Sequence, residues 1–460
     1  MVRVPGPARR GRADAARERA EARRVAARAA EPGVTAVLLF GLPVLFALGV
    51  PIAFGLGLAT TFALLFGGSV PLIVVPQRVF TSLDSFPIMA VLLFMLAGSI
   101  MDEGGMARRI ISFAGALLGQ FRASLAMIAV GATMLISGVS GSGTADTAAV
   151  GSVMIPAMMK RGYEPRFVTA IQAAAGALGP IIPPSIIMVV LGSVTNTSIG
   201  QLFIGGIIPG IIIGGFLMIV CYVHARRGGA AYEATETFSW SRVWTTFWQA
   251  IPGLGMAILI LGGILTGVFT ATESAVMGVV YGFVIGLWVY RELRLSQIPR
   301  MLVEAACRSA IILIIIGTAG LFGWLVANLQ IPTVVARFLQ DHSANWIVFM
   351  ILVNALLLLL GMFMESIAVI IILMPILYPV AQSFGIDLLH FGVVVSVNLS
   401  IGLVTPPYGA TLFVACSIAK MSIREVTPAL LPSIFVMIIA QALITFIPPL
   451  TTWLPRLFIP

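Results

Sequence analysis

The sequence between Ser137 and Asp146 combines helix-breaking glycines, hydroxyl side chains and a carboxylate within an otherwise apolar region. In a bilayer, every backbone N–H and C=O group must find a partner inside the protein. Broken backbone at that depth is therefore tolerated only where it lines a cavity or binds an ion. This stretch predicts a binding site whose polar side chains are Ser137, Ser140, Ser142, Thr144 and Asp146.

A second stretch repeats the same features in the same order. The aligned pairs are Asp146 with Glu365 and Pro156 with Pro375, each 219 positions apart, and Pro183 with Pro406 and Pro209 with Pro432, each 223 positions apart. One loop insertion accounts for the change in offset. Aligned features in matching order indicate a duplicated unit, and such repeats are typical of secondary transporters.

In each half of the chain, a later apolar span is interrupted near its middle by glycine and adjacent prolines. The interruptions are Gly179–Ser185 and Gly402–Gly409. Adjacent prolines cannot continue a helix, because proline lacks the N–H donor and clashes with the preceding turn. Each break therefore frees backbone carbonyls that can bind a cation, and it exposes the N-terminus of a second half-helix to an anion.

The acidic side chains of Asp146 and Glu365 admit three roles. An ionisable group at membrane depth is functional by default, because an unpaired charge there is costly. Each carboxylate could ligate a cation or relay protons. Because each acid lies a few residues after a helix break, it could instead accept backbone N–H bonds and brace the hairpin. The sequence leaves these three roles open.

The composition places these motifs in an integral membrane protein. Of the 460 residues, 59% are hydrophobic and 10% are charged, and the mean hydropathy is +1.06. Apolar runs of spanning length, about 20 residues, recur from Val34 to the C-terminus. Four interrupted runs, 123–158, 166–198, 345–380 and 388–418, carry Gly, Pro, hydroxyl or acidic residues near their middles. We therefore predict an all-α, multi-pass protein embedded in a lipid bilayer.

Positive charge is concentrated at the start of the chain. The formal net charge is +9, and nine arginines lie within residues 1–33. An Arg/Ala tail before a first span is typical of a topogenic or lipid-surface segment, and no aromatic residues alternate with the arginines as in a nucleic-acid module. We predict a disordered tail over 1–33, a membrane domain over 34–460 and no nucleic-acid binding.

Basic residues also predict how the two halves are oriented. Those that flank the first interrupted run put both of its ends in the cytoplasm, so the hairpin 123–158 would be re-entrant from inside. By the same count, the hairpin 345–380 opens from outside. The repeats, about 85–225 and about 303–450, would then be inverted. This count also places the N-terminus outside, in conflict with the arginine-rich tail.

The sequence lacks the motifs of other chemistries. Cys221, Cys307 and Cys416 are isolated, and the histidines are dispersed, which argues against a disulfide framework or a zinc site. No nucleophile–base pair, HExxH, P-loop or dinucleotide-binding motif occurs. We therefore predict neither an enzyme nor a bound cofactor, and the chain cannot energise transport by hydrolysing ATP itself.

Trp240, Trp244 and Trp248 recur at every fourth residue, which places three indoles on one face of a helix. A tryptophan belt of this kind is typical of the membrane–water interface at headgroup level. We predict that residues 238–249 form a short amphipathic helix that lies along the interface.

Four segments together resemble the large permease subunit of tripartite ATP-independent periplasmic (TRAP) transporters. They are SGVSGSGTADTAAVGSVMIPAMMKRGYEP, AAAGALGPIIPPSIIMVVLG, SIGQLFIGGIIPG and NLSIGLVTPPYGATLFVACSIAKMS. The similarity runs from about Val34 to the C-terminus. It implies the inverted-repeat elevator fold of the ion-transporter superfamily. In that fold a transport domain, with two re-entrant hairpins and two discontinuous helices, slides against a scaffold.

The resemblance also implies sodium-coupled uptake of a small organic acid across the bacterial inner membrane. The family works with a small four-helix permease subunit and a soluble periplasmic solute-binding protein. This chain is too short to include the small subunit as a complete fused domain, so we expect both partners to be separate polypeptides. Sodium is the implied coupling ion, and no other metal or cofactor is implied.

Carried over position by position, the resemblance implies two sodium sites with a substrate site between them. The first sodium site comprises Ser140, Gly141, Ser142, Gly143, Asp146, Gly179, Pro180 and Pro183. The second comprises Gly361, Glu365, Ser366, Gly402, Val404, Thr405 and Pro406. The substrate carboxylate would lie near Ser142, Thr144, Ser185 and Thr405, with Asn398 as an additional hydrogen-bond donor.

Three other functions stay open at this point. A stand-alone carboxylate symporter or anion exchanger of the same superfamily would need no soluble partner. An intramembrane enzyme would need Asp146 and Glu365, the candidate acid pair, to face each other at one depth. A passive channel is disfavoured, because hairpins paired with broken helices are typical of alternating access.

Overall fold

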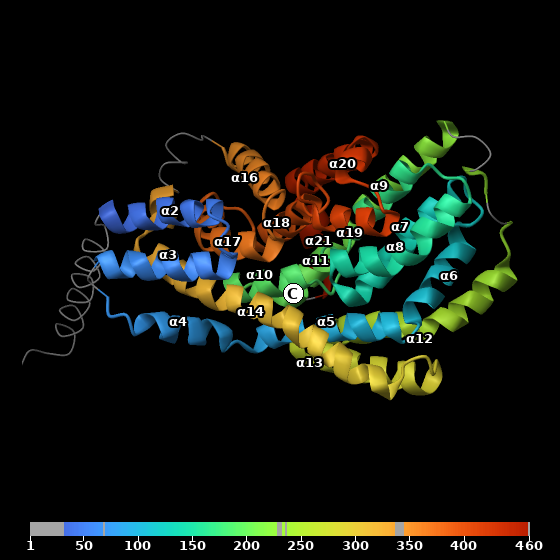
Figure 1. Cartoon of the computed structure of the whole chain (residues 1–460), viewed down its shortest axis with the longest axis horizontal. Coiled ribbons are helices and arrows are strands. Elements are labelled where there is room, and N and C mark those ends of the chain that lie inside the picture. The colour runs from blue at the N-terminus through green and yellow to red at the C-terminus, as the bar shows by residue number, and fades with distance from the viewer. Residues whose placement is uncertain (1–31, 68–69, 228–231, 235–236, 336–344, 459–460) are drawn as a thin grey trace, which may run out of the picture. The chain divides into compact units, whose positions relative to one another are not determined.

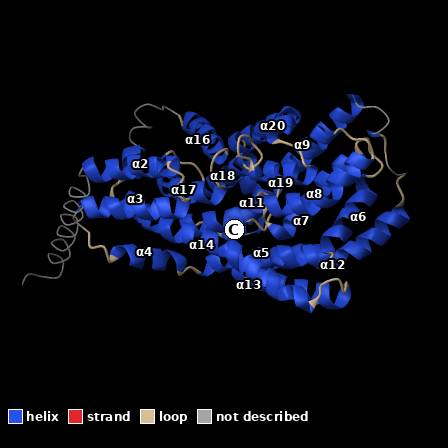
Figure 2. Ribbon diagram, viewed as in Figure 1, coloured by secondary structure: helices blue, strands red, loops and turns tan. Residues whose placement is uncertain are grey.

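The computed structural model describes residues 32–67, 70–227, 232–234, 237–335 and 345–458. The predicted tail, 1–33, lies outside the described residues except for its last two positions. Among the described residues every regular element is a helix, and Figure 2 shows no strand. In the described part of the chain, seven helices are long and apolar enough to cross a membrane. The predicted all-α membrane fold is confirmed.

Contacts divide the chain into two compact units. The described parts of 1–84, 313–342 and 371–380 form the first unit, and those of 85–312, 343–370 and 381–460 form the second. Because α17 (Ser366–Ser383) crosses two of these boundaries, its middle belongs to the first unit and its ends to the second.

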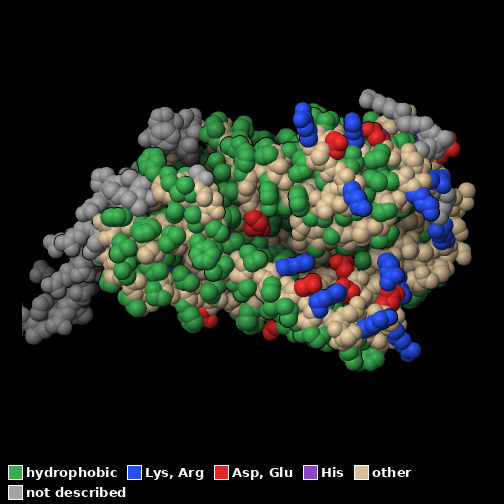
Figure 3. Space-filling model, viewed as in Figure 1, with side chains coloured by type: hydrophobic (Ala, Val, Ile, Leu, Met, Phe, Trp, Pro, Cys, Tyr) green, Lys and Arg blue, Asp and Glu red, His purple; other side chains and the backbone are tan. Residues whose placement is uncertain are grey.

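The first unit contains α2 (Pro32–Ala47), α3 (Ile52–Gly67), α4 (Val74–Leu83) and the C-terminal half of α14 (Ile298–Asn328). Helices α2 and α3 pack side by side (Figure 1). The guanidinium carbon of Arg78 lies 5.0 Å from the centre of the Trp324 ring, a cation–π contact that joins α4 to α14. Hydrophobic side chains cover most of the face of this unit that Figure 3 shows, as expected for a surface in lipid.

The second unit contains the first predicted hairpin, the tip of the second hairpin and both predicted breaks, while the middle of α17, the later arm of the second hairpin, belongs to the first unit. Its first part comprises α5 (Phe86–Glu103), α6 (Met106–Leu118), α7 (Ser124–Ser140), α8 (Gly143–Lys160), α9 (Pro165–Gly176), α10 (Ile186–Thr195), α11 (Ile199–Arg227), α12 (Trp240–Leu265) and α13 (Ala271–Val284). The later part comprises α16 (Trp346–Gly361), α18 (Leu388–Gly402), α19 (Ala410–Ala419), α20 (Ile423–Phe446) and α21 (Pro449–Phe458).

The order of helices along the chain follows the predicted duplication. The series α7 to α11 is matched by the series α16 to α20, and in each series the third and fourth helices are separated by a proline-containing break. The half-helices after the breaks, α10 and α19, are each 10 residues long. The breaks therefore fall where adjacent prolines end helix propagation. The re-entrant orientation of the hairpins stays a prediction.

The predicted short helix over 238–249 is wrong in its extent. Residues Trp240–Leu265 form one helix of 26 residues, α12, which runs through Pro252. A proline inside a helix costs about 3 kcal/mol, but packing of α12 along α6 and α13 offsets that cost. The shared face of the three indoles is confirmed, because Trp240, Trp244 and Trp248 are 76%, 62% and 56% exposed.

Candidate functional site

The first hairpin turns between the end of α7 at Ser140 and the start of α8 at Gly143. Gly141 closes α7 with φ +62°, a left-handed conformation that glycine adopts without a steric penalty. A Cβ at this position would lie 2.5 Å from the carbonyl oxygen of Pro184 in the first break. Position 141 therefore requires glycine for two reasons: its left-handed backbone conformation and the close approach of the first break.

Asp146 is fully buried and holds the two arms of the hairpin together. The Ser137 hydroxyl donates to its Oδ2 at 2.6 Å, and the Ser140 hydroxyl donates to its Oδ1. None of the ion pairs among the described residues includes Asp146. These contacts brace the hairpin, but through side-chain hydroxyls and not through the predicted backbone N–H groups. The prediction that Asp146 ligates sodium stays a prediction.

The first break packs directly onto the hairpin tip. The Ile186 N–H donates to the Gly141 carbonyl at 3.4 Å. A Cβ on Gly179 would lie 2.6 Å from Oδ2 of Asp146 and 2.7 Å from the backbone nitrogen of Gly143. The break and the tip therefore touch through backbone, with room only for glycine.

Ser185 forms the N-cap of the half-helix α10, which begins directly after the break. Its hydroxyl accepts from the Met188 N–H at 3.2 Å and donates to the Pro180 carbonyl at 2.5 Å. The cap satisfies one of the N–H groups that a helix start leaves without a partner. The predicted substrate residue Ser185 is thus fully buried and already bonded within the break.

The second hairpin tip has an equivalent contact with the second break. A Cβ on Gly402 would lie 2.8 Å from Cα of Gly361, at the end of α16. The Ser366 hydroxyl donates to the Leu399 carbonyl at 3.4 Å, and the Tyr408 N–H donates to the Met362 carbonyl at 3.3 Å. The predicted pairing of 361–366 with 402–406 is present in the structure.

Glu365 differs from Asp146 although the two align in the repeat. It is exposed at the second tip, and its Oε2 accepts from the N–H groups of Ile367 at 3.1 Å and Ala368 at 3.4 Å. A carboxylate at this position caps the first turn of α17 and complements the positive end of that helix. Among the described residues, no hydrogen bond joins the carboxylates of Asp146 and Glu365.

The half-helix that follows the second break, α19, also lies against the tip of the first hairpin. Helix α19 packs against α8 and α9, and the Thr411 methyl carbon lies 3.2 Å from the position of a Cβ on Gly143. The Thr411 hydroxyl donates to the Leu403 carbonyl at 2.9 Å. The two halves of the repeat therefore meet around the first hairpin tip, with the N-termini of α8, α10 and α19 among the elements that form it.

The hydroxyl groups predicted for the substrate lie on different parts of this region. The Ser142 and Thr144 hydroxyls are 3.3 Å apart at the start of α8, and both residues are partly exposed. The Thr405 hydroxyl, in the second break, donates to the Ile401 carbonyl near the end of α18 at 2.7 Å. Ser142 and Thr144 are therefore the members of this set with accessible surface and a shared location.

Sequence reasoning did not assign Thr411 to the site, and it gave Ser137 no role in either sodium site. Ser137 stood in the motif, and its spacing of nine residues from Asp146 across a turn could have indicated the contact. No local signal pointed to Thr411, because its approach to Gly143 depends on packing between the two halves.

Asn398 lies in a separate network between α16, α18 and α20. Its Nδ2 donates to the backbone oxygen of Asn354 at 3.1 Å and to the Oδ1 of Asn354 at 2.8 Å, and Gln441 donates to the same Oδ1 at 2.6 Å. These residues line a mainly apolar cavity of about 240 Å³. The donor group of Asn398 is thus engaged in helix packing, and its contact with substrate stays a prediction.

We expect Asn398→Ala to lower stability and to leave transport affinity unchanged. The substitution removes two hydrogen bonds from a buried network, a loss of about 1–3 kcal/mol. A lower midpoint of thermal unfolding in detergent, with an unchanged substrate concentration for half-maximal uptake, would support the packing role. A raised half-maximal concentration with an unchanged midpoint would instead assign Asn398 to the substrate.

Comparison with known proteins places these hairpins and breaks in a family. The sequence profile described as "Tripartite ATP-independent periplasmic transporter, DctM component" matches residues 39–450. The chain belongs to this family. It is therefore a transporter permease rather than an enzyme, as its sequence predicts.

The names of related proteins mention several different substrates. The permease is 38% identical over 439 residues to the C4-dicarboxylate TRAP transporter large permease protein DctM of Rhodobacter capsulatus, covering 92% of this chain and 99% of the relative. It is 41% identical over 389 residues to the isethionate TRAP transporter permease protein DctMQ of Oleidesulfovibrio alaskensis, covering 84% of this chain and 60% of the relative. The sialic acid TRAP transporter permease protein SiaT of Haemophilus influenzae is 36% identical over 384 residues, which is 84% of this chain and 62% of that protein.

Solved structures resemble the permease in fold. The YdaH transporter of Alcanivorax borkumensis aligns with a TM-score of 0.58 at 17% identity, covering 81% of this chain and 88% of that one. MtrF of Neisseria gonorrhoeae aligns with a TM-score of 0.55 at 15% identity, covering 82% and 85%. Both likenesses concern the membrane transporter fold alone.

Proposed function

We propose that this permease performs sodium-coupled uptake of a small organic acid that a periplasmic solute-binding protein delivers at the bacterial inner membrane. One observation carries the proposal: each of two hairpin tips closes onto a proline-broken helix through glycine backbone contacts, at Gly141 and Gly179 and again at Gly361 and Gly402. Such breaks offer carbonyl oxygens and helix N-termini at one place, which suits a cation and an anion together.

The buried carboxylate of Asp146 supports a cation at the first tip. A charged group removed from water is costly unless it is paired, and this one has two hydroxyl donors but no basic partner among the described residues. Sodium coordinated by oxygens of Ser140–Gly143 and Gly179–Pro183 would supply the missing charge, because hard cations prefer oxygen ligands. The second proposed sodium site is formed by 361–366 and 402–406.

The proposed substrate position lies between the two tips, at the accessible hydroxyls of Ser142 and Thr144. The helices α8, α10 and α19 begin near this position, and helix N-termini attract carboxylates. The names of the relatives, which include C4-dicarboxylates, isethionate and sialic acid, all denote organic acids. This agreement supports a small organic acid without selecting one.

We further propose an elevator motion in which the hairpin α7–α8 and the breaks move together. Helix α8 packs against α7, α9 and α19, so a displacement of the tip would carry the break contacts with it. A small four-helix permease subunit is the other expected partner. The family normally works with that subunit and with the soluble binding protein.

Reconstituted transport tests the proposed function directly. Proteoliposomes that contain the permease and its small subunit would receive an imposed sodium gradient, the binding protein and a panel of labelled organic acids. We expect uptake that needs both sodium and the binding protein. Uptake that persists without the binding protein would favour the stand-alone symporter, and uptake that is indifferent to sodium would contradict the coupling.

A further inference from the structure

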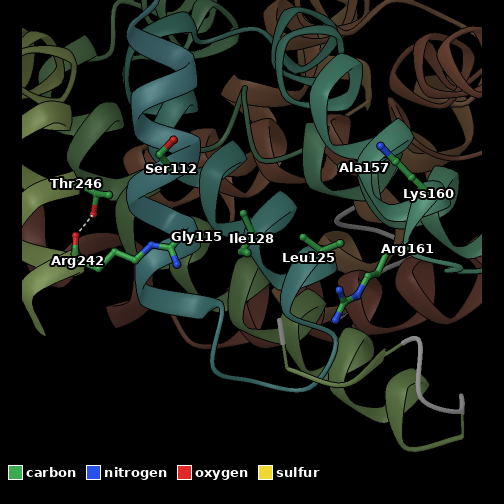
Figure 4. A pocket seen from close by; sticks show the side chains of 9 residues that line it. All are labelled: Ser112, Gly115, Leu125, Ile128, Ala157, Lys160, Arg161, Arg242 and Thr246. Carbon is green, nitrogen blue, oxygen red and sulfur yellow. Dashed lines mark hydrogen bonds between the residues drawn. The ribbon is translucent and has the colours of Figure 1, made fainter. Parts of the chain in front are cut away.

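A second cavity lies in the same unit, at the end of the first hairpin that is opposite to its tip. Its volume is about 600 Å³, and it opens between α6, α7, α8 and α12. Figure 4 shows Arg242 of α12 on one side of the cavity, and Lys160 and Arg161 at the end of α8 on the other. A helix rises about 1.5 Å per residue, so the 14 residues from Asp146 to Lys160 put this cavity about 20 Å from the hairpin tip.

The lining of this cavity is positively charged. It includes three cationic side chains, Lys160, Arg161 and Arg242, and no acidic residue. Lys160 and Arg161 have no ion-pair partner among the described residues. In contrast, Arg108 and Arg109 on the neighbouring α6 both pair with Glu292. The first turns of α7 and α12 also contribute to the lining, so the positive ends of two helix dipoles add to the potential.

The tryptophan belt on α12 fixes the depth of the cavity in the membrane. Arg242 and Thr246 alternate along this helix with the exposed indoles of Trp240, Trp244 and Trp248. Exposed tryptophans of this kind lie at the headgroup level of a bilayer. On the face that Figure 3 shows, the Lys and Arg side chains of the second unit also gather toward the end where α6, α8 and α12 lie. The cavity therefore opens where lipid phosphates are found.

The remaining lining suits a lipid better than a free anion. The hydroxyl residues Ser112 and Thr246 lie beside apolar positions such as Leu125 and Ile128. A phosphodiester headgroup would place its charge among the three cations and its glycerol and acyl carbons against the apolar side chains. Basic pockets between membrane helices recognise anionic headgroups in this way.

We propose that this cavity binds the headgroup of an anionic phospholipid such as phosphatidylglycerol. Because its lining comes from the hairpin helices α7 and α8 and also from α6 and α12, a bound headgroup bridges these two pairs of helices. The site is separate from the hairpin tips, so the proposal does not depend on sodium coupling or on the identity of the transported acid.

The test measures lipid binding by the full chain in detergent. Phosphatidylglycerol would be titrated while native mass spectrometry counts bound lipid and thermal unfolding reports stabilisation. We expect Lys160→Gln/Arg161→Gln to weaken binding about 10- to 30-fold, because each basic residue near a membrane surface contributes about 1 kcal/mol. The conservative variant Lys160→Arg/Arg161→Lys keeps both charges and should retain the affinity. It also shows whether any loss reflects misfolding.

Matched controls distinguish a specific lipid site from non-specific electrostatic attraction and from a site for a small anion. Arg291→Gln/Arg308→Gln removes the same charge from exposed positions outside the cavity and should leave binding unchanged. Equal binding by the Lys160→Gln/Arg161→Gln variant and the unmodified chain would overturn the proposal. So would equal binding of phosphatidylcholine with the same acyl chains. Stabilisation by inorganic phosphate as strong as that by phosphatidylglycerol would reassign the cavity to a free anion.

Discussion

Gly402→Ala is expected to raise the sodium concentration needed for half-maximal uptake by about 5- to 150-fold, the equivalent of about 1–3 kcal/mol of overpacking. The added Cβ would lie 2.8 Å from Cα, 2.9 Å from the carbonyl carbon and 3.0 Å from the carbonyl oxygen of Gly361. These are backbone atoms, so no side-chain rotation relieves the contact. The second tip must therefore move away from its break, which separates the oxygens proposed to coordinate sodium.

Two further glycines make this experiment specific. The backbone of Gly402 does not have a positive φ, so alanine can adopt its conformation. The expected effect therefore comes only from the steric contact of the added Cβ. Gly262 and Gly215 lie within α12 and α11 with nothing within 4 Å of an added Cβ. Alanine at either control position should leave the sodium dependence of uptake unchanged. A Gly402→Ala permease with unaltered sodium dependence would show that the contact between the second tip and its break does not form the ion site.

Asp146→Asn is expected to weaken sodium activation of uptake by about 100-fold or more, because removing one member of a buried charge pair costs about 3–5 kcal/mol. The asparagine keeps the size of the side chain, and it keeps one oxygen that can accept from Ser137 or Ser140. Charge is therefore the main property lost. Sodium titration of uptake in proteoliposomes, together with the unfolding midpoint of the same sample, is the measurement.

The aligned acid provides the comparison for Asp146→Asn. Glu365 is exposed and caps α17, and Glu365→Gln preserves an oxygen that can accept the same N–H bonds. We expect this change to alter sodium activation less than about fivefold, since an N-cap contributes about 1 kcal/mol. If Asp146→Asn lowers only the unfolding midpoint and leaves sodium activation intact, Asp146 is a brace and not a sodium partner.

A lipid bound at the basic cavity would act on the same hairpin from its other end. Helix α8 carries Asp146 near its first turn and Lys160 at its last residue, so the tip and the cavity share one rigid element. In the proposed elevator motion, a bound headgroup would restrain the hairpin against α6 and α12. Uptake assays with the Lys160 and Arg161 variants would test whether lipid binding at the cavity affects transport.

The sequence by itself determined the membrane class, the two helix breaks and the two hairpin tips. These features depend on local chemistry: apolar runs must lie in lipid, and adjacent prolines or glycines limit the backbone wherever they occur. Gly141, Pro183 and Pro406 therefore mark the correct positions without knowledge of any contact. Local chemistry did not predict that α12 continues through Pro252. Packing of α12 against α6 and α13 offsets the cost of the proline there.

The family resemblance implied that each hairpin tip pairs with its break, but only the tertiary structure decided the other contacts between elements. It placed α19 against the first hairpin, set Asp146 between Ser137 and Ser140, and engaged Asn398 with Asn354. It also brought Arg242 and Lys160 to the lining of one cavity, although the two lie 82 positions apart in the chain. Such contacts depend on the complementary packing of several helices at once, and no periodicity or motif within one segment encodes them.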